Sequence, residues 1–176
     1  MGPVDPKVTG GFDNSFKYGP FRMNIFFTYQ FGSKIWLYPS FNYRYYDNSA
    51  LPKEMADRWM VPGDEKYTNI PALVSKRQYA DDATLQVAYN AYNYCTERVA
   101  KGDFIRLKDI SVSYDIPKNW LDYAGFSSAS LRFSVSNIAL LYSDKKLKGQ
   151  DPEFARSGGV SLPVASQFSL SLKVGL

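Results

Sequence analysis

The chain has 176 residues, of which 45% are hydrophobic and 22% charged, with 21 Lys and Arg against 17 Asp and Glu, no His and one Cys. The absence of His excludes imidazole relays and imidazole metal sites, and a single Cys excludes an internal disulfide and a thiolate zinc cluster. The hydrophobic content is too high for a disordered chain, yet no stretch approaches the roughly 20 apolar residues of a membrane helix. The basic residues are scattered, which does not indicate nucleic-acid binding.

Strict alternation of apolar and polar residues is the main signal and predicts β-strands. The first two strands are expected at residues 7–18 and 21–33, with a tight turn between them. In the second strand every second residue from Phe21 to Phe31 is apolar, and Phe26 is the one apolar residue at the positions between them. The pair Gly10-Gly11 is expected to weaken the first strand or to bend it.

Three further strands are expected at residues 103–116, 130–142 and 167–176. The last is the clearest, because apolar residues alternate with Ser, Lys and Gly over nearly its whole length. Its length of about ten residues is that of a membrane-spanning strand. The sequence thus predicts about five antiparallel strands.

Two irregularities interrupt the alternation. Arg106 and Lys108 fall on the apolar parity of their strand, so that face is expected to leave any apolar environment near Asp109. In the next strand the apolar parity switches at Asn137, which predicts a β-bulge there.

The connections between the expected strands are strongly unequal. Residues 34–102 and 143–163 form long loops, and the other two connections are short. Short helices are possible at 53–60, 83–99 and 118–124. Short turns at one end of a sheet and long loops at the other are typical of outer-membrane β-barrels, where the long loops are extracellular.

Composition of the two faces favours a membrane wall over a soluble sheet. One face is rich in Phe, Tyr, Leu and Val, which suits lipid, and the other in Ser, Thr, Asn, Gln, Lys and Arg, which suits a water-filled lumen. Aromatic residues also gather at strand ends, as in interfacial girdles: Tyr18, Phe21, Tyr29, Phe31, Tyr114 and Tyr142. A soluble sandwich alternates as well, so a soluble β-rich, carbohydrate-binding module stays open as the alternative.

Several segments, in order along the chain, resemble the SusC/RagA family of TonB-dependent outer-membrane transporters. The most specific, DFIRLKDISVSYDIP at 103–117, resembles the family's F-x-R-L-K-N-I-S-L-G-Y-x-L-P. The others are DPKVTGGF at 5–12, FTYQFG at 27–32, DRW at 57–59, LRFSVSN at 131–137, KGQDPE at 148–153 and QFSLSL at 167–172. Each match is loose alone, but together they span nearly the whole chain.

The resemblance implies the C-terminal part of such a transporter: the last five strands of a 22-stranded barrel, with the plug domain absent from these residues. It implies import of glycans or peptides across the outer membrane of a Gram-negative bacterium. The implied partners are a SusD-like surface lipoprotein, the rest of the barrel and plug, TonB, the barrel-assembly machinery through the last strand, and an oligosaccharide or peptide substrate. An aromatic residue is common at the family's last position, where this chain has Leu176.

Two groups of residues are candidates for function. Aromatic side chains of the long first loop could stack on sugar rings or apolar side chains, or else pack the loop or dock the lipoprotein: Tyr38, Tyr43, Tyr45, Tyr46, Trp59, Tyr92 and Tyr94. Polar residues of the strands are expected to line the lumen: Arg22, Asn24, Gln30, Arg132 and Lys173. No catalytic residue, metal ligand, cofactor or nucleic-acid site is predicted, and the chain is not expected to be an enzyme.

Overall fold

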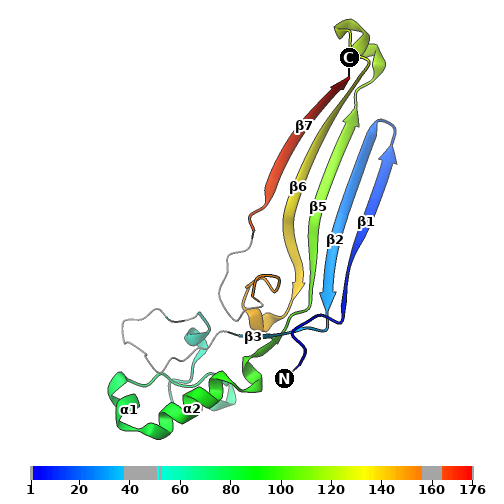
Figure 1. The fold of residues 1–176 in the computed structure, drawn as a ribbon. Helices are drawn as coiled ribbons and strands as arrows, with labels where there is room; N and C mark the ends of the chain where they lie inside the picture. Colours follow the sequence, from blue (N-terminus) through cyan, green and yellow to red (C-terminus); the bar gives the residue numbers. More distant parts are fainter. Residues whose placement is uncertain (1, 38–50, 52, 156–163, 176) are drawn as a thin grey trace.

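The computed structural model describes residues 2–37, 51, 53–155 and 164–175. Its main element is one long, twisted antiparallel sheet with the strand order β1-β2-β5-β6-β7 (Figure 1). The strands are β1 (Val8–Tyr18), β2 (Phe21–Phe31), β5 (Phe104–Asp115), β6 (Ser128–Ser143) and β7 (Gln167–Gly175). The predicted antiparallel all-β architecture is confirmed, and the five strands begin and end within two residues of the expected ranges.

Near the short-turn end of the sheet, directly paired residues of neighbouring strands lie on the same face and form rows across all five strands. One apolar row runs across all five strands through Phe16, Met23, Val112, Phe133 and Leu170. The adjacent row on the opposite face is polar throughout: Ser15, Asn24, Ser111, Ser134 and Ser169. The sheet therefore has one apolar and one polar face, as the alternation predicts.

The break in alternation on β5 is a bulge, which corrects the expectation that its face leaves an apolar environment near Asp109. Phe26 pairs with Asp109 and Phe27 with Leu107, so Lys108 is the extra residue. The bulge returns Leu107 to the apolar face and turns Arg106 onto the polar face. The predicted bulge on β6 is confirmed, since Asn137 has a left-handed φ of 53° inside the register shift.

The Gly10-Gly11 pair does not interrupt β1, contrary to the expectation that it weakens or bends the strand. β1 pairs with β2 without a register shift along its whole length. A Cβ on Gly10 would lie 2.6 Å from the Tyr29 hydroxyl, and one on Gly11 would lie 2.8 Å from the Phe26 ring. The two glycines thus make room for aromatic rings on opposite faces of the sheet, because successive side chains of a strand alternate between faces.

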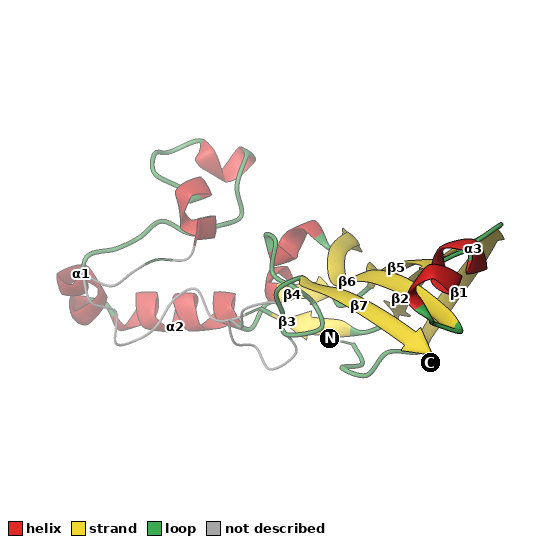
Figure 2. Ribbon diagram, turned by 90° about the horizontal axis from the view of Figure 1, so that it is seen from above, coloured by secondary structure: helices red, strands yellow, loops and turns green. Residues whose placement is uncertain are grey.

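The long connections gather at one end of the sheet (Figure 1); their short strands and α1 were not predicted, whereas a 3-10 turn and a helix lie within the expected ranges 53–60 and 83–99. Strands β3 (Lys34–Trp36) and β4 (Val99–Lys101) form a separate two-stranded sheet. The helices in this region are α1 (Lys76–Asp81) and α2 (Ala83–Asn93), with 3-10 turns η1 (Lys53–Asp57), η2 (Asp64–Lys66), η3 (Thr96–Arg98) and η5 (Lys145–Leu147). Seen from above, α1 and α2 extend away from the main sheet (Figure 2).

A small apolar core holds this end together. It consists of Ile35 on β3, Ala100 on β4, and Leu147 and Ala155 from the segment after β6. The four residues are at most 5% exposed. Segments far apart in sequence therefore meet where β2, β5 and β6 reach the long loops.

The opposite end carries only the short connections (Figure 1). β1 and β2 turn at Gly19, whose φ is 55°. β5 and β6 are joined through α3 (Lys118–Leu121) and η4 (Asp122–Ala124), and Gly125 follows in the left-handed region with φ 73°. Among the described residues, no helix is both long enough and apolar enough to cross a membrane.

Candidate functional site

A buried ion pair ties the segment after β6 to the polar face of β5. Arg106 donates to the Asp151 carboxylate, and the two side chains are 6% and 5% exposed. Glu153 adds a second negative charge, with Oε2 3.4 Å from Nε of Arg106. Two backbone N–H groups, of Phe154 and Ala155, donate to the Asp151 carbonyl. The bulge at Lys108 makes this arrangement possible, because it turns Arg106 onto the polar face.

A second ion pair joins the first half of the first long loop to the end of that loop. Arg98 donates from Nη1 to both Glu54 carboxylate oxygens at 2.8 Å. The Arg98 side chain is 4% exposed and that of Glu54 15%. This ion pair joins η1 to η3, the 3-10 turn that directly precedes β4.

Asp144 organises the turn that follows β6. Its carboxylate accepts backbone N–H bonds from Lys101 at 2.7 Å and Lys146 at 3.0 Å. Partial burial by itself would raise the pKa of Asp144, but these donors and the two lysine charges outweigh it, so the pKa lies below the usual 3.8. The ionised form of Asp144 therefore stabilises the contact between this turn and β4.

The strand residues predicted to line a lumen share the polar face. Arg22, Asn24 and Gln30 come from β2, Arg132 from β6 and Lys173 from β7. Asn24 accepts a hydrogen bond from Ser15 at 2.7 Å, and Arg132 donates to Ser111 at 3.0 Å. Gln30 differs from the others because it is buried at the loop end, where its amide donates to Ser33.

Four of the seven predicted ligand aromatics, Tyr38, Tyr43, Tyr45 and Tyr46, lie outside the described residues. The other three differ in their exposure to solvent. Trp59 follows η1 and is 40% exposed, whereas Tyr94 ends α2, is 56% exposed and stacks on Trp36 with 5.3 Å between ring centroids.

Tyr92 is the least available of these aromatics. It is partly buried, with the Arg98 guanidinium 5.8 Å from its ring centroid. Burial raises the pKa of Tyr92, and the nearby Arg98 charge only partly offsets this effect. Tyr92 therefore packs the loop, while Trp59 and Tyr94 present their rings to solvent.

An open hollow of about 540 Å³ is lined in part by Asp57 and Arg58, which directly precede Trp59 in the chain. The sequence did not predict this hollow. Charged groups of both signs line it, from Asp57, Arg58, Asp64 and Lys148. Tyr67, which is 89% exposed, lies at its wall. Exposed polar groups beside an aromatic ring can bind hydroxyl or amide groups of a polar ligand. Among the described residues there is no cluster of acidic and Cys side chains that could hold a metal ion.

Sequence reasoning also missed Arg106 and Asp151 as a pair. Both stand in segments that carry the family resemblance, but only folding brings residues 45 positions apart together. The apolar neighbours Ile105 and Leu107 point to the opposite face of the strand, so they give no sign that Arg106 is buried.

Comparison with known proteins gives consistent matches to one class. No family model matches the chain. TonB-dependent receptor P39 of Formosa agariphila is 28% identical over 165 residues, which cover 88% of this chain and 14% of the receptor. TonB-dependent receptor P3 of the same organism is 28% identical over 159 residues, covering 87% of this chain and 13% of the receptor.

Solved structures agree on the fold. The RagAB peptide importer matches in its closed-closed state with a TM-score of 0.66 and in its open-open state with 0.64, each at 21% identity. The matches cover 97% and 98% of this chain and 17% of the importer chain. The resemblance to TonB-dependent transporters of the SusC/RagA type is confirmed.

This similarity concerns a small part of much longer proteins, since the chain spans about one seventh of the length of the curated relatives it matches. The relatives are named as receptors and an importer, not as enzymes. The similarity therefore covers nearly all of this chain but only a small part of each relative.

Proposed function

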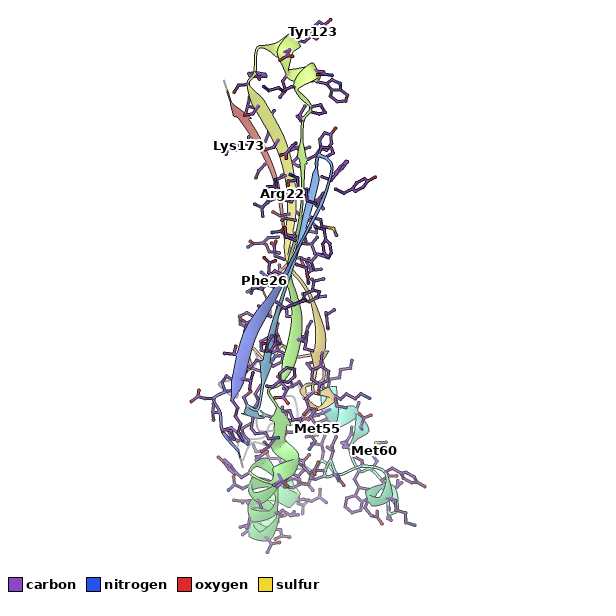
Figure 3. The ribbon with its side chains drawn as sticks, turned by 90° about the vertical axis from the view of Figure 1, so that its right-hand side faces the viewer. Arg22, Phe26, Met55, Met60, Tyr123 and Lys173 are labelled. Atoms are coloured by element: carbon purple, nitrogen blue, oxygen red, sulfur yellow. The ribbon has the colours of Figure 1, made fainter. Side chains whose placement is uncertain are left out.

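We propose that this chain forms part of the wall and the extracellular loops of an outer-membrane TonB-dependent importer. The observation that carries the proposal is the apolar face of the five-stranded sheet. Every strand contributes exposed apolar side chains to it, for example Phe12 at 58%, Phe133 at 45% and Leu170 at 70%. No second layer covers this face within the described part of the chain, and the sheet seen from its side is one layer thick (Figure 3). A face of this size needs lipid or another apolar partner.

The dimensions of the face support a lipid-facing role. Aromatic residues mark both ends, with Phe21 opposite Tyr18 and Tyr114 at the short-turn end and Tyr29 at the loop end. Phe21 and Tyr29 are separated by eight residue steps along β2, a rise of about 26 Å at about 3.3 Å per step. At the usual tilt of about 40°, this corresponds to about 20 Å, close to the ~25 Å apolar band of outer-membrane barrels.

The finer features of the proposal rest on the family resemblance. The chain would supply the last five strands of a 22-stranded barrel, and its polar face would line the lumen. The longer protein would import glycans or peptides, with energy supplied through TonB and a SusD-like lipoprotein at the extracellular mouth. The last strand would engage the barrel-assembly machinery. The exposed rings of Trp59 and Tyr94 would be available to a substrate or to the lipoprotein.

Site-directed spin labelling tests the wall. Cys95, the only cysteine, is first replaced by Ser. Single cysteines then replace Leu170, on the apolar face, and its neighbour Ser171, on the polar face, in the protein held in outer-membrane vesicles. We expect the label at position 170 to be accessible to oxygen and shielded from a water-soluble nickel complex, and the label at position 171 to show the reverse.

Equal access of the nickel complex to both labels would contradict the proposal. So would a chain that is monomeric and cooperatively folded without detergent, and that result would favour the soluble carbohydrate-binding alternative. For the loop aromatics, Trp59→Ala and Tyr94→Ala in the longer transporter are expected to weaken substrate binding or lipoprotein association. If both properties are unchanged, these residues are not part of the site.

A further inference from the structure

Positive charges cross the polar face of the sheet near its short-turn end. Lys17 on β1 lies directly opposite Arg22 on β2, and Ser113 on β5 connects Arg22 to Arg132 on β6. Lys173 on β7 lies diagonally beyond Arg132, opposite Ser130. We name these four residues, Lys17, Arg22, Arg132 and Lys173, the cationic row. Arg22 and Lys173 are labelled at this end of the sheet in Figure 3.

The sheet itself does little to neutralise the cationic row. Lys17 and Arg22 are a directly opposed like-charge pair, an arrangement that destabilises a sheet. Asp115 is the one carboxylate that pairs with the row among the described residues, with 3.9 Å between its Oδ2 and Nη2 of Arg22. Both side chains are more than half exposed, and such a pair contributes only about 0–1 kcal/mol.

The other carboxylates of the polar face are too far away to compensate. Asp13 and Asp109 flank Phe26 on its two neighbouring strands. Phe26 is four residues along β2 from Arg22, a rise of about 13 Å. This exceeds the screening length of about 8 Å at physiological salt. Between the two rows lie only neutral hydrogen-bonding side chains, those of the Ser15–Asn24–Ser111–Ser134–Ser169 row.

The spacing of the row fits an extended acidic chain. Neighbouring strands are about 4.8 Å apart, so β1 and β6 are separated by about 14 Å. In an extended peptide, side chains at alternate positions point to one side, and three of them span about 13 Å. A segment with Asp or Glu at every second position can therefore place one carboxylate near each of Lys17, Arg22 and Arg132, which a single small anion cannot do.

We propose that the cationic row docks an acidic polypeptide segment, with carboxylates at alternate positions, across the polar face of the sheet. The inference rests on the charge pattern and the register, and it stands whether or not the apolar face contacts lipid. The neutral row beside the cations supplies hydroxyl and amide groups that can satisfy the backbone of the docked segment.

The test measures binding of a fluorescein-labelled (Asp-Ser)4 peptide to the full chain in detergent by anisotropy, at low salt. We expect the double variant Arg22→Gln/Arg132→Gln to bind at least tenfold more weakly than the unchanged chain. The matched control is Lys118→Gln/Lys145→Gln, which removes the same charge from exposed positions outside the row and is expected to stay within twofold. Arg22→Lys/Arg132→Lys keeps the charge and is expected to keep most of the binding.

The proposal is overturned if the peptide does not bind the unchanged chain, or if the row variant and the control lose affinity equally. It is also overturned if inorganic phosphate competes as strongly, mole for mole, as unlabelled peptide, because the row is then a small-anion site. An (Asp)4(Ser)4 peptide separates spacing from charge: we expect it to bind more weakly than the alternating peptide, and equal binding would remove the alternate-position part of the proposal. Unchanged circular dichroism of each variant shows that the sheet is intact.

Discussion

The buried pair between Arg106 and Asp151 makes a quantitative prediction about the segment after β6. Asp151→Asn keeps the shape of the side chain and leaves a guanidinium that is 6% exposed without its main carboxylate. Removing one member of a buried pair costs about 3–5 kcal/mol. Glu153, 3.4 Å from Nε and 42% exposed, offsets part of this cost, so we expect about 3 kcal/mol.

Hydrogen exchange read by mass spectrometry reports this loss locally. A change of about 3 kcal/mol corresponds to about a hundredfold shift in an opening equilibrium. The amides of Gln150, Phe154 and Ala155, which donate to carbonyls of this segment, should therefore exchange about a hundredfold faster in the variant. Amides in the middle of β5 and β6 should change little, because they lie in the main sheet.

Two controls make the reasoning refutable. Lys148→Gln breaks an exposed pair with Asp57 in the same segment, at 3.6 Å, and should speed exchange by less than about fivefold. The double variant Arg106→Met/Asp151→Leu removes both charges and should recover most of the protection. If Asp151→Asn exchanges no faster than Lys148→Gln, the ion pair does not hold this segment in place.

Three further outcomes are expected. Because the pKa of Asp144 in the folded protein lies below its ordinary value, the ionised carboxylate stabilises the fold above pH ~4, and this stabilisation is lost as the pH falls below that value. Protection of the Lys146 amide against hydrogen exchange should therefore drop below pH ~4. Asp144→Asn should abolish this pH dependence. Asn137→Val should lower the free energy of unfolding by about 1–2 kcal/mol, because a β-branched residue disfavours the left-handed φ of 53°. Asn137→Gly should leave it nearly unchanged. Equal denaturation midpoints for the two variants would show that backbone strain at position 137 is not important. Gly10→Ala should lower the midpoint by about 1–3 kcal/mol, since its Cβ would meet the Tyr29 hydroxyl, and the loss should shrink in a Tyr29→Leu background.

The strands were predictable because apolar residues recur at every second position, and every second residue of a strand points to the same face. One face of the sheet is mostly apolar and the other mostly polar, with exceptions such as Asn14 and Phe26, and a slip of one residue would turn the apolar side chains onto the polar face. The strand ends and the bulge at Asn137 were therefore readable from local sequence. The residues of the polar face named for the lumen do share one face, and only Gln30 turned out to be buried.

The irregular features were not readable in this way. A shift of parity at Arg106 and Lys108 is compatible with a change of environment or with a bulge, and only pairing with β2 distinguishes them. The Gly10-Gly11 pair has a different meaning once Tyr29 and Phe26 lie beside it. The contributions of Tyr38, Tyr43, Tyr45 and Tyr46 stay predictions.

The sequence by itself determined the two-faced antiparallel sheet, the separation of long and short connections at its two ends and the family resemblance, because these properties depend on periodicity and on order along the chain. Only the tertiary structure decided which charges are neutralised. Arg106 forms a buried ion pair with Asp151, 45 residues further along the chain. Lys17 and Arg22, five residues apart across a hairpin, oppose each other on an open face. Charge balance depends on distances between strands, and those distances are set by register and bulges rather than by composition.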